Sequence, residues 1–306
     1  MSIVVVGSLN MDLVVSVRQR PHTGETVLGS DVRFVGGGKG ANQAIAAARL
    51  GGRVSMVGKV GDDPFGGTLI ANLTAAGVAT GGVKVEPGVS SGVAFITLDA
   101  AGDNQIIVSP GANARLTPAD VRAQAALLGQ AQALLLQLET PLPTVLEAAR
   151  VAHEQGATVI LDPAPAQPLP SELLKLVDFL TPNEHEAAAL SDQPITDLKS
   201  AKVAAAKLLS QGVRQVLLKL GGEGVLCAAG NTFEHVPAFP VEVVDTTAAG
   251  DAFGAAFAVA WLEHGDLARA LRFASAAGAL TVTKAGAQSS LPYRKEVEAF
   301  LAAQGV

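Results

Sequence analysis

Cysteine is nearly absent from this chain of 306 residues, and aromatic residues are scarce. Cys227 is the only cysteine, so no disulfide can form within the chain. This is typical of proteins in a reducing compartment and predicts a cytoplasmic location. Aromatic residues make up 4% of the chain, although hydrophobic residues make up 49% and glycine occurs 33 times. A composition so rich in small aliphatic residues favours parallel strands covered by closely packed helices over an all-β sandwich.

Basic residues are too few to attract polyanions. The 22 lysines and arginines are outnumbered by 28 aspartates and glutamates, which gives a formal net charge of −6 and an isoelectric point near 5.4. We therefore expect no nucleic acid and no anionic membrane as a partner. The five histidines lack the spacing of zinc ligands. No apolar run reaches about 18 residues and the first residues lack a signal-peptide pattern, so we expect neither secretion nor a membrane span.

The order of helical and extended segments predicts the fold class. From residue 117 onward the two kinds of segment alternate. The predicted helices are 118–128, 141–155, 171–176, 184–190 and 197–211, and the predicted strands are 133–138, 157–161, 177–180 and 214–219. Such alternation predicts an α/β fold with a doubly wound, mostly parallel sheet between helices.

The first third of the chain departs from this alternation. Strand 13–17 follows strand 3–6 without a helix between them, and segments 93–98 and 105–108 flank the turn-forming residues 99–104. We therefore predict one α/β domain over residues 1–306 that carries a small β-sheet lid. The lid is expected to comprise about residues 12–35 and 93–108.

One stretch combines a predicted strand, a turn of small residues and the start of a buried helix. Residues 241–244 are predicted to be extended, and residues 252–262 favour a buried helix. Between them, residues 248–250 leave backbone N–H groups uncovered at a helix N-terminus, which favours an anion such as phosphate. Asp251 then lies in the first turn of the helix, where a carboxylate is also an ordinary helix cap.

A glycine-rich stretch over residues 36–44 follows a short extended segment. It fails as a phosphate-binding P-loop, because Gly40 stands after Lys39 where serine or threonine would contact magnesium. By letter it matches the dinucleotide-binding fingerprint, with Asp62 about 20 residues further on. The preceding strand is shorter and less apolar than this fingerprint expects. The fingerprint also gives no role to Lys39 or Asn42.

Polar residues follow several predicted strands, where open α/β sheets bind ligands. Asn10 and Asp12 would lie on the same side of an extended backbone, which suits the recognition of sugar hydroxyls, although an Asx turn would use the same residues. Glu139 follows strand 133–138 and either faces a ligand or caps the next helix. Residues 184–186, Glu-His-Glu, cannot all bind one metal ion, because adjacent residues of a helix point in different directions. Residues 219–224 are also typical of a hairpin turn.

Four of these stretches resemble motifs of the ribokinase-like (pfkB-type) carbohydrate kinases. Asp-Thr-x-Ala-Ala-Gly-Asp-x-Phe at 245–253 resembles the C-terminal signature of the family, and Gly-Gly-Lys-Gly-Ala-Asn at 37–42 resembles its sugar-binding motif. An Asn-x-x-Glu element at 183–186 and a glycine-rich loop at 219–224 resemble the nucleotide-binding elements. The four motifs occur in the expected order, and the resemblance covers nearly the whole chain. It implies the ribokinase-like fold and ATP-dependent phosphorylation of D-ribose at O5.

The resemblance also implies the residues of the site. Asp251 is the expected general base, and the backbone of Ala248, Ala249 and Gly250 is the expected anion hole. The implied sugar-binding residues are Asn10, Asp12, Gly38, Lys39, Asn42, Glu139 and Asp251. The implied nucleotide-binding residues are Asn183, Lys219, Leu220, Gly221, Gly222, Glu223, Gly224, Gly250, Asp251 and Ser275. Ser275 stands where some relatives have a histidine near the adenine.

Metal ions and a second copy of the chain are the other implied partners. Glu186 is expected to act on Mg²⁺ through water. A K⁺ ion beside the anion hole is expected at Asp245, Thr247, Thr281, Lys284, Gly286 and Ser290, mostly through backbone carbonyls. The substrates would be D-ribose and Mg-ATP, and pairing of two lids implies a homodimer.

Three other functions stay open on the sequence. Another kinase of the same fold, acting on fructose, adenosine or 2-keto-3-deoxygluconate, would use the same chemistry. An acid substrate would need an arginine, and the matched sugar positions contain none, which favours a neutral polyol. A non-catalytic sugar sensor would keep the fold, but the intact Asp251 favours an enzyme. A nicotinamide-dependent enzyme rests on residues 36–41 alone.

Overall fold

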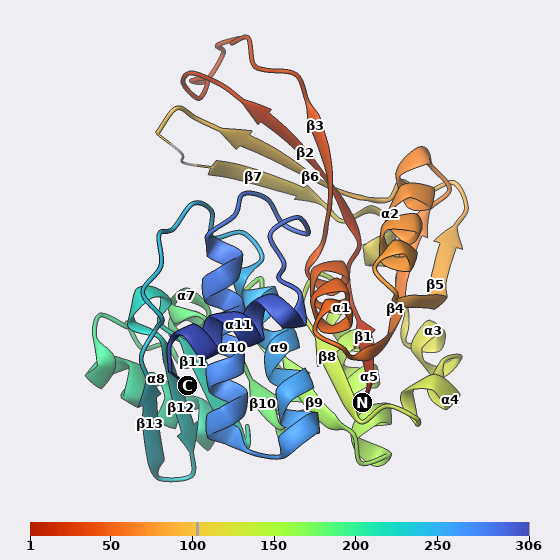
Figure 1. Ribbon diagram of the computed structural model, residues 1–306. Coiled ribbons are helices and arrows are strands. Elements are labelled where there is room, and N and C mark those ends of the chain that lie inside the picture. Colours follow the sequence, from red (N-terminus) through yellow and green to blue (C-terminus); the bar gives the residue numbers. More distant parts are fainter. Residues whose placement is uncertain (102–103, 306) are drawn as a thin grey trace.

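The computed structural model describes residues 1–101 and 104–305, which form two β-sheets with helices on both faces of the larger one (Figure 1). Residues 102 and 103 of the predicted turn 99–104 lie outside the described residues. The larger sheet has the strand order β13-β12-β11-β10-β9-β8-β1-β4-β5. Neighbouring strands are parallel, except for the antiparallel pairs β11–β12 and β12–β13. The strands are β1 (Ser2–Val6), β4 (Arg53–Gly61), β5 (Ala79–Glu86), β8 (Ala133–Leu136), β9 (Thr158–Leu161), β10 (Phe179–Leu180), β11 (Gln215–Lys219), β12 (Val225–Ala229) and β13 (Thr232–Val236).

Two hydrophobic clusters cover the two faces of this sheet. Alternate residues of β1 enter each cluster, Ile3 and Val5 on one face and Val4 and Val6 on the other. The helices of the first cluster are α1 (Lys39–Arg49), α2 (Pro64–Ala75), α9 (Ala249–His264), α10 (Leu267–Val282) and α11 (Arg294–Ala303). Those of the second are α3 (Pro118–Arg122), α4 (Ala125–Leu128), α5 (Leu142–Glu154), α6 (Ser171–Leu176), α7 (Glu184–Ser191) and α8 (Leu198–Ser210). The predicted α/β class with a doubly wound, mostly parallel sheet is confirmed.

Helix α9 is buried along most of its length, which fixes its position in the fold. Residues 251–260 are all buried, and most of them are alanine, glycine or phenylalanine. Small side chains let α9 pack closely against α1 and α10, while Phe257 meets Phe179 of β10 edge to face, with ring centroids 4.7 Å apart. The N-terminus of α9 is therefore held rigidly near the ends of the central strands.

The smaller sheet stands apart from the larger one (Figure 1). Its strand order is β3-β2-β6-β7, with β2 and β6 parallel and the outer pairs antiparallel. The strands are β2 (Asn10–Ser16), β3 (Arg33–Gly37), β6 (Gly92–Leu98) and β7 (Asn104–Ser109). They lie within or beside the segments predicted for the lid, and the closing motion that the word lid implies stays a prediction.

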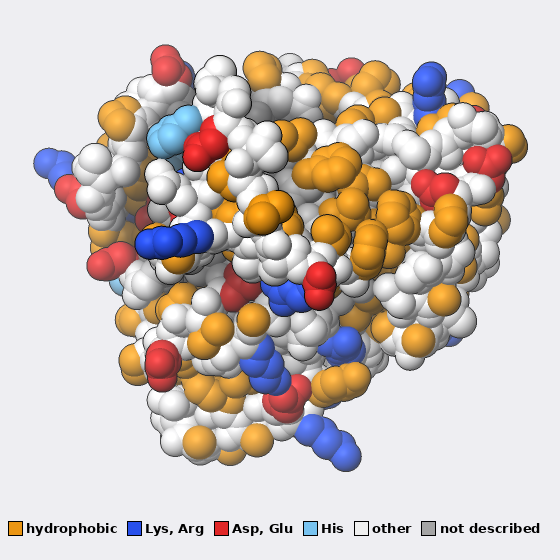
Figure 2. Space-filling view, turned by 90° about the horizontal axis from the view of Figure 1, so that it is seen from above, with side chains coloured by type: hydrophobic (Ala, Val, Ile, Leu, Met, Phe, Trp, Pro, Cys, Tyr) orange, Lys and Arg blue, Asp and Glu red, His pale blue; other side chains and the backbone are white. Residues whose placement is uncertain are grey.

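One face of the smaller sheet is apolar and exposed. Phe34, Leu13, Phe95 and Ile107 are neighbours in the register of the four strands, so they form a row on the same face. Phe34 is 60% exposed, Phe95 49% and Ile107 65%. Seen from above, hydrophobic side chains gather on this side of the molecule (Figure 2). Because side chains alternate along a strand, Asn10 and Asp12 point to the opposite face.

Two predicted elements differ from the structure. The predicted strand 241–244 belongs to neither sheet. The chain leaves edge strand β13 here, and the N–H groups of Val244 and Asp245 donate to the carbonyl of Val282 at the end of α10. The predicted helix 118–128 is two helices, α3 and α4, because the chain tightens into a three-residue turn at Gln124, whose N–H donates to Val121. Among the described residues, every helix is too short or too polar to cross a membrane.

Candidate active site

The N-terminus of α1 is anchored by groups outside the helix. The Lys39 N–H donates to Glu139 Oε2 (3.2 Å), and the Gly40 N–H donates to Ser8 Oγ (3.3 Å). Ser8 in turn donates its hydroxyl to Glu139. Glu139 therefore caps α1, which has no capping side chain of its own. The alternative in which Glu139 caps the following helix is wrong, because α5 has no side-chain cap.

Asn10 and Asp12 are buried residues of β2 beside this anchor. Asn10 Nδ2 makes a long hydrogen bond to Glu139 Oε2 (3.5 Å), and Asn113 Nδ2 donates to Asn10 Oδ1 (2.7 Å). The predicted alternative of an Asx turn is wrong, since both residues are in a strand. Burial and then the charges of Glu139 and Asp251 raise the pKa of Asp12 to about 7. A buried group of amides and carboxylates suits the recognition of several hydroxyls.

Gly38 and Lys39 lie between these polar side chains and a cleft that is described below. Gly38 has φ of +87°, and a Cβ there would lie 2.7 Å from the Asn10 backbone nitrogen, so the position requires glycine. Burial lowers the pKa of Lys39, but the charges of Asp251, Asp162 and two glutamates outweigh it and raise the pKa above its ordinary value. Lys39 therefore stays a cation among carboxylates.

The glycine-rich stretch does not form a dinucleotide-binding turn. Gly36 and Gly37 end β3, an edge strand of the smaller sheet that runs antiparallel to β2. The fingerprint requires a buried parallel strand that leads into its helix. Asp62 is engaged with the Gly88 N–H (3.0 Å). The nicotinamide alternative is therefore wrong.

Helix α9 begins at the turn that was predicted to bind an anion. Its N-cap, Ala248, has φ of +61°, a conformation that costs free energy for a residue with a Cβ. Within the described part of the chain, the N–H groups of Ala248, Gly250 and Asp251 have no hydrogen-bond acceptor, and that of Ala249 has only a long bond to Thr246 (3.3 Å). No side chain caps α9, so the alternative of Asp251 as an ordinary cap is wrong. Bare N–H groups at the positive end of a helix suit an anion.

The Asp251 carboxylate lies where α9 meets α1, and it is 4% exposed. Its Oδ2 accepts a hydrogen bond from Asn42 Nδ2 (2.9 Å), and its Oδ1 accepts one from Gln43 Nε2 (3.3 Å). Burial raises the pKa of Asp251 and Lys39 lowers it, and the resulting pKa is about 6. A carboxylate with this pKa is ionised at neutral pH and is suited to accept a proton there.

A cleft of about 910 Å³ adjoins Asp251 and Lys39. Asn104 and Ile106 of β7 also line it, so the smaller sheet contributes one wall. The predicted nucleotide-binding residues that line the cleft are Asn183, Lys219, Gly221, Gly222, Gly224, Gly250, Asp251 and Ser275. Leu220 is instead buried in the core and Glu223 is exposed. The hairpin interpretation of this loop is also confirmed, because η2 (Gly221–Glu223) joins the antiparallel strands β11 and β12.

Oppositely charged side chains lie within the cleft. Lys219 Nζ forms an ion pair with Asp162 Oδ1 (2.8 Å), and a Cβ at Gly250 would lie 3.0 Å from the same Nζ. The ammonium is therefore close to the bare N-terminus of α9. Asn183 and Glu186 cap α7 reciprocally, with two hydrogen bonds of 2.8 Å. Burial, followed by the charge of Asp162, raises the pKa of Glu186.

Three of the residues predicted to bind K⁺ come together beside the start of α9. Asp245 Oδ1 accepts from the Thr247 N–H (2.9 Å) and hydroxyl (2.6 Å), and its Oδ2 accepts from the Gly286 N–H (2.8 Å). Although burial raises the pKa of Asp245, these hydrogen bonds hold it below its ordinary value. The other three side chains bind elsewhere: Thr281 donates to the Ala277 carbonyl, Ser290 to the Ala287 carbonyl and Lys284 to Glu296. The Thr281 carbonyl also accepts the Lys284 N–H (3.3 Å), so a cation site at these residues stays a prediction.

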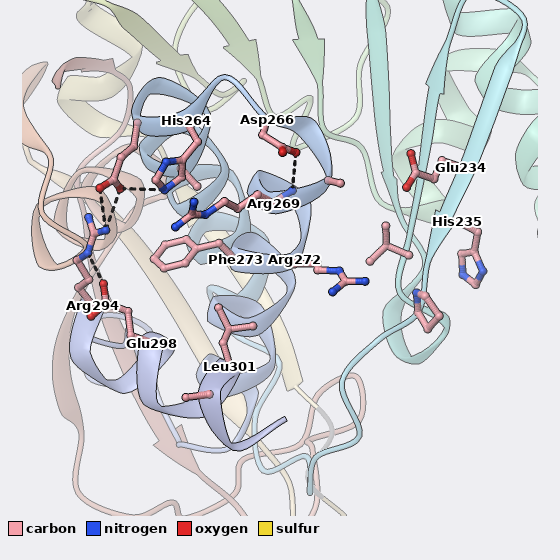
Figure 3. Close-up of a pocket in the computed structure, with 16 residues that line it drawn as sticks. Glu234, His235, His264, Asp266, Arg269, Arg272, Phe273, Arg294, Glu298 and Leu301 are labelled. Atoms are coloured by element: carbon pink, nitrogen blue, oxygen red, sulfur yellow. Dashed lines mark hydrogen bonds and ion pairs between the residues drawn. The ribbon is translucent and has the colours of Figure 1, made fainter. Parts of the chain in front are cut away.

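A second cavity, of about 610 Å³, lies among β13, α9, α10 and α11 (Figure 3). None of the residues that the sequence singled out lines it. Arg294 is paired there with Glu263 (2.8 Å) and Glu298 (2.7 Å), and its guanidinium lies over the ring of Phe273. Since the charge of Arg294 is already neutralised by these two glutamates, we place the active site in the larger cleft.

The sequence did not reveal four polar residues of the site: Ser8, Gln43, Gln137 and Asp162. Ser8, Gln137 and Asp162 come directly or almost directly after β1, β8 and β9. Their place at the ends of parallel strands was a usable signal. Gln43 had no such signal, because only the fold brings it to Asp251, 208 positions away.

Comparisons with known proteins identify the family. A model described as pfkB family carbohydrate kinase matches residues 1–294. The chain is 46% identical over 300 residues to ribokinase of Bacillus subtilis, and 39% identical over 302 residues to deoxyribokinase of Salmonella typhimurium, covering 98% of this chain and 99% of each relative. The structure of Arabidopsis thaliana ribokinase complexed with ribose and ATP is similar with a TM-score of 0.90 and 37% identity over 98% of both chains. The chain therefore belongs to the pfkB family of carbohydrate kinases.

Proposed function

We propose that the protein transfers the γ-phosphoryl group of ATP to O5 of D-ribose. The observation that carries the proposal is the position of the buried Asp251 carboxylate. It accepts a hydrogen bond from Asn42 of α1 and also lines the cleft. A sugar hydroxyl on one side and a phosphate on the other would meet at this carboxylate. The ribokinases among the relatives support D-ribose as the sugar.

Asp251 would accept the proton of the attacking hydroxyl. As O5 bonds to the γ-phosphorus, the bond from that phosphorus to the bridging oxygen breaks, and its electron pair leaves with ADP. The proton on Asp251 then passes to solvent. A carboxylate is far too weak a base to ionise an alcohol beforehand, so it assists and aligns the attack, which is worth about 10²–10⁴-fold in rate.

Stabilisation of phosphate charge would supply the larger part of the rate enhancement. The N–H groups of Ala248 and Gly250 lack acceptors within residues 1–101 and 104–305, and their helix presents its positive end to the cleft. Lys219 lies close to Gly250 and would add a point charge. The buried helix α9 fixes the N–H groups, and the ion pair with Asp162 holds Lys219, before any ligand arrives, so little reorganisation is needed during the reaction.

The cleft fits a magnesium ion that arrives with the nucleotide. No cluster of three or more potential metal ligands occurs among the described His, Cys, Asp and Glu residues. Mg²⁺ at phosphate-transfer sites keeps several waters and bonds to phosphates and to one or two carboxylates. Glu186 and Asp162 are the carboxylates that line the cleft beside Lys219, and Glu186 would hold the ion through water. When bound, Mg²⁺ neutralises charge on the phosphates. An unchanged magnesium requirement in Glu186→Gln would contradict this role.

A K⁺ ion beside the anion hole forms part of the proposal. Asp245, Thr247 and Gly286 supply a carboxylate and a turn there, and the carbonyls of Thr281, Lys284 and Ser290 would complete the set. The ion would steady the turn that presents the bare N–H groups of α9. We expect higher activity in potassium than in sodium or Tris buffer, and equal rates in desalted enzyme would refute the site.

The smaller sheet is proposed as a lid and as a dimer interface. Its β7 already lines the cleft, so a small movement would cover the sugar and limit wasteful hydrolysis of ATP. Its exposed apolar row includes Phe34, Phe95 and Ile107, and a second copy of the chain would bury these side chains in a dimer interface. Sedimentation should give a dimer for the unsubstituted chain and a monomer for Phe95→Lys. The cytoplasmic location stays a prediction.

A different sugar is the nearest alternative. The deoxyribokinase relative makes 2-deoxyribose the first competitor. An ADP-release assay with Mg-ATP should therefore test ribose, 2-deoxyribose, arabinose, xylose, fructose, adenosine and 2-keto-3-deoxygluconate. Ribose-dependent turnover of at least about one per second is expected. Turnover with another compound would move the substrate, whereas ribose binding without turnover would favour a sugar sensor.

A further inference from the structure

Two neighbouring amides of α1 bind the two oxygens of the Asp251 carboxylate. Asn42 Nδ2 lies 2.9 Å from Oδ2, and Gln43 Nε2 lies 3.3 Å from Oδ1. Both amide residues are buried. Successive side chains on a helix point about 100° apart, so both reach one carboxylate only because α1 and α9 are packed together at this point. Asn42 belongs to the family motif, whereas Gln43 has been given no role.

A second buried amide fixes the orientation of Gln43. Gln137 follows β8 and is fully buried, and its Nε2 donates to Gln43 Oε1 (2.6 Å). Because its oxygen receives this donor, Gln43 turns its NH₂ group toward Asp251. A flipped amide would set its oxygen against the carboxylate and its NH₂ against the NH₂ of Gln137. Both contacts therefore specify the same orientation.

Gln137 is a poor choice for packing alone. Its Oε1 is buried and has no hydrogen-bond partner in the described part of the chain. Such an unsatisfied oxygen destabilises a fold relative to an apolar side chain of similar shape. Gly7 accommodates it, since a Cβ at that position would overlap Oε1. The amide is thus present at a cost in stability, and within the described residues its side chain makes one hydrogen bond, to Gln43.

We propose that Gln43, oriented by Gln137, is a positioning residue for the Asp251 carboxylate. Its N–H limits rotation of the carboxylate, for which Asn42 is the other side-chain donor among the described residues, and it stabilises the ionised form. The inference deepens the proposed function, on which it rests for the role of Asp251 as a base.

Charged groups from four other parts of the chain also act on Asp251, and they stay the same when the amide of Gln43 is removed. They are Lys39 on α1, Asp12 on β2, Glu139 after β8 and Asp162 after β9. Lys39 favours the ionised carboxylate, and the three acids disfavour it. All four remain in variants of Gln43, so a changed titration of Asp251 in those variants reports the lost amide.

The test compares the pH dependence of kcat in Gln43→Leu, Gln137→Leu, the double variant and the unsubstituted enzyme. In Gln43→Leu we expect the acidic limb to move up by about half a unit to one unit. We expect kcat at its optimum to fall about tenfold, with the Kd for ribose changed less than about threefold. Gln137→Leu should act in the same direction but less. The double variant should match Gln43→Leu rather than add to it, because Gln137 acts through Gln43.

A matched control removes a buried hydrogen bond elsewhere. Thr144 of α5 donates its hydroxyl to the Leu116 carbonyl (2.7 Å). Thr144→Val deletes this hydroxyl, so it should lower Tm without moving the acidic limb. An acidic limb in Gln43→Leu that coincides with the limbs of the control and the unsubstituted enzyme would overturn the inference.

A second measurement needs no substrate. The ¹³C carboxyl signal of Asp251, assigned by its loss in Asp251→Asn, is titrated in the ligand-free protein. The pKa of Asp251 should rise in Gln43→Leu, and an unchanged pKa would overturn the positioning role. If the unsubstituted enzyme releases no ADP with ribose, the proposed function fails, and this titration still decides whether Gln43 acts on Asp251.

Discussion

Two helix N-termini lie at the candidate active site, and they differ in whether their backbone N–H groups have hydrogen-bond acceptors. At α1, the first N–H groups donate to Glu139 and Ser8 from other parts of the chain. At α9, the N–H groups of Ala248 and Gly250 find no acceptor within residues 1–101 and 104–305. The N–H groups of α1 are already satisfied within the protein, so this end positions side chains. The N–H groups of α9 stay available to a ligand.

The energetics of the two ends differ accordingly. Residues 248–250 are half-buried and line the cleft, and the left-handed conformation of Ala248 costs free energy at this end. The burial of α9 keeps this end in place despite that cost. Substitutions at α1 should therefore act on stability and sugar binding, and substitutions at α9 should act on phosphate binding and turnover. Four experiments, from the largest expected effect to the smallest, test this division.

The largest effect is expected for Asp251→Asn, at the point where the two helices meet. The side chain keeps its shape but loses the charge that accepts the proton, so kcat should fall by about 10²–10⁴-fold. Ribose affinity, measured by calorimetry, should stay within about tenfold. A variant that retains most of its kcat would remove Asp251 from the role of base.

Gly250→Ala tests the end of α9. The new Cβ would lie 3.0 Å from Lys219 Nζ and would cover the bare N–H groups, so kcat/KM for ATP should fall by about 10²-fold. Stability should be kept or slightly raised, because alanine favours a helix over glycine by about 0.5–1 kcal/mol. Steady-state kinetics and thermal unfolding of one preparation measure both quantities. A loss of stability with normal kinetics would reverse the assignment of this helix end.

Asp12→Asn tests the acidic surroundings of α1 through pH. Asp12 has a pKa of about 7 in the fold against an ordinary value of 3.8. Between these values the unfolded chain releases a proton that the folded chain keeps, so the free energy of unfolding falls as pH rises to 7. The variant lacks this penalty and should be more stable than the unsubstituted protein at pH 8 by about 2–4 kcal/mol, the upper value corresponding to the whole shift from 3.8 to about 7. The difference should vanish near pH 3, below both pKa values, and urea unfolding at pH 8 and pH 3 measures it. An equal difference at both would contradict the raised pKa.

Ser8→Ala tests the joint at α1. The loss of the hydroxyl that links Glu139 and Gly40 should lower the free energy of unfolding by about 1–2 kcal/mol. The KM for ribose should rise, while that for ATP changes little. Ser210→Ala, which removes an exposed hydroxyl at the end of α8, is the matched control and should do neither. An equal rise in the KM values for ribose and ATP would contradict the assignment of α1 to sugar binding.

The sequence predicted the parts of the site that depend on local chemistry. The small-residue turn at 248–250 predicts uncovered N–H groups at the start of a helix by itself, and Glu139 is found by its place after a strand. The resemblance to a family implied sugar-binding roles for Asn10 and Lys39, which stay predictions. The strand predicted at 241–244 failed for a physical reason: β-branched residues favour extension, but the segment pairs with no strand and instead meets the end of α10.

Contacts between distant segments were beyond local reasoning. The orientation of Gln43 depends on Gln137, which is 94 positions away, and its target Asp251 is further still. On the sequence alone Gln43 is one more polar residue in a helix. The bare N–H groups of α9 were foreseen, but the external capping of α1 was not, because Ser8 reaches it only through the order of strands in the sheet.

Strand β2 also limits how the chain can tolerate insertions. Asn10 and Asp12 face the polar group, while Leu13 belongs to the exposed row on the other face. A shift of one residue along this strand would exchange the two faces, so that an aliphatic side chain entered the proposed sugar site and a carboxylate entered the apolar row. A single inserted or deleted residue within β2 would therefore disable both surfaces at once. Residues 18–31, which join β2 to β3 outside any helix or strand, would absorb the same change with little consequence.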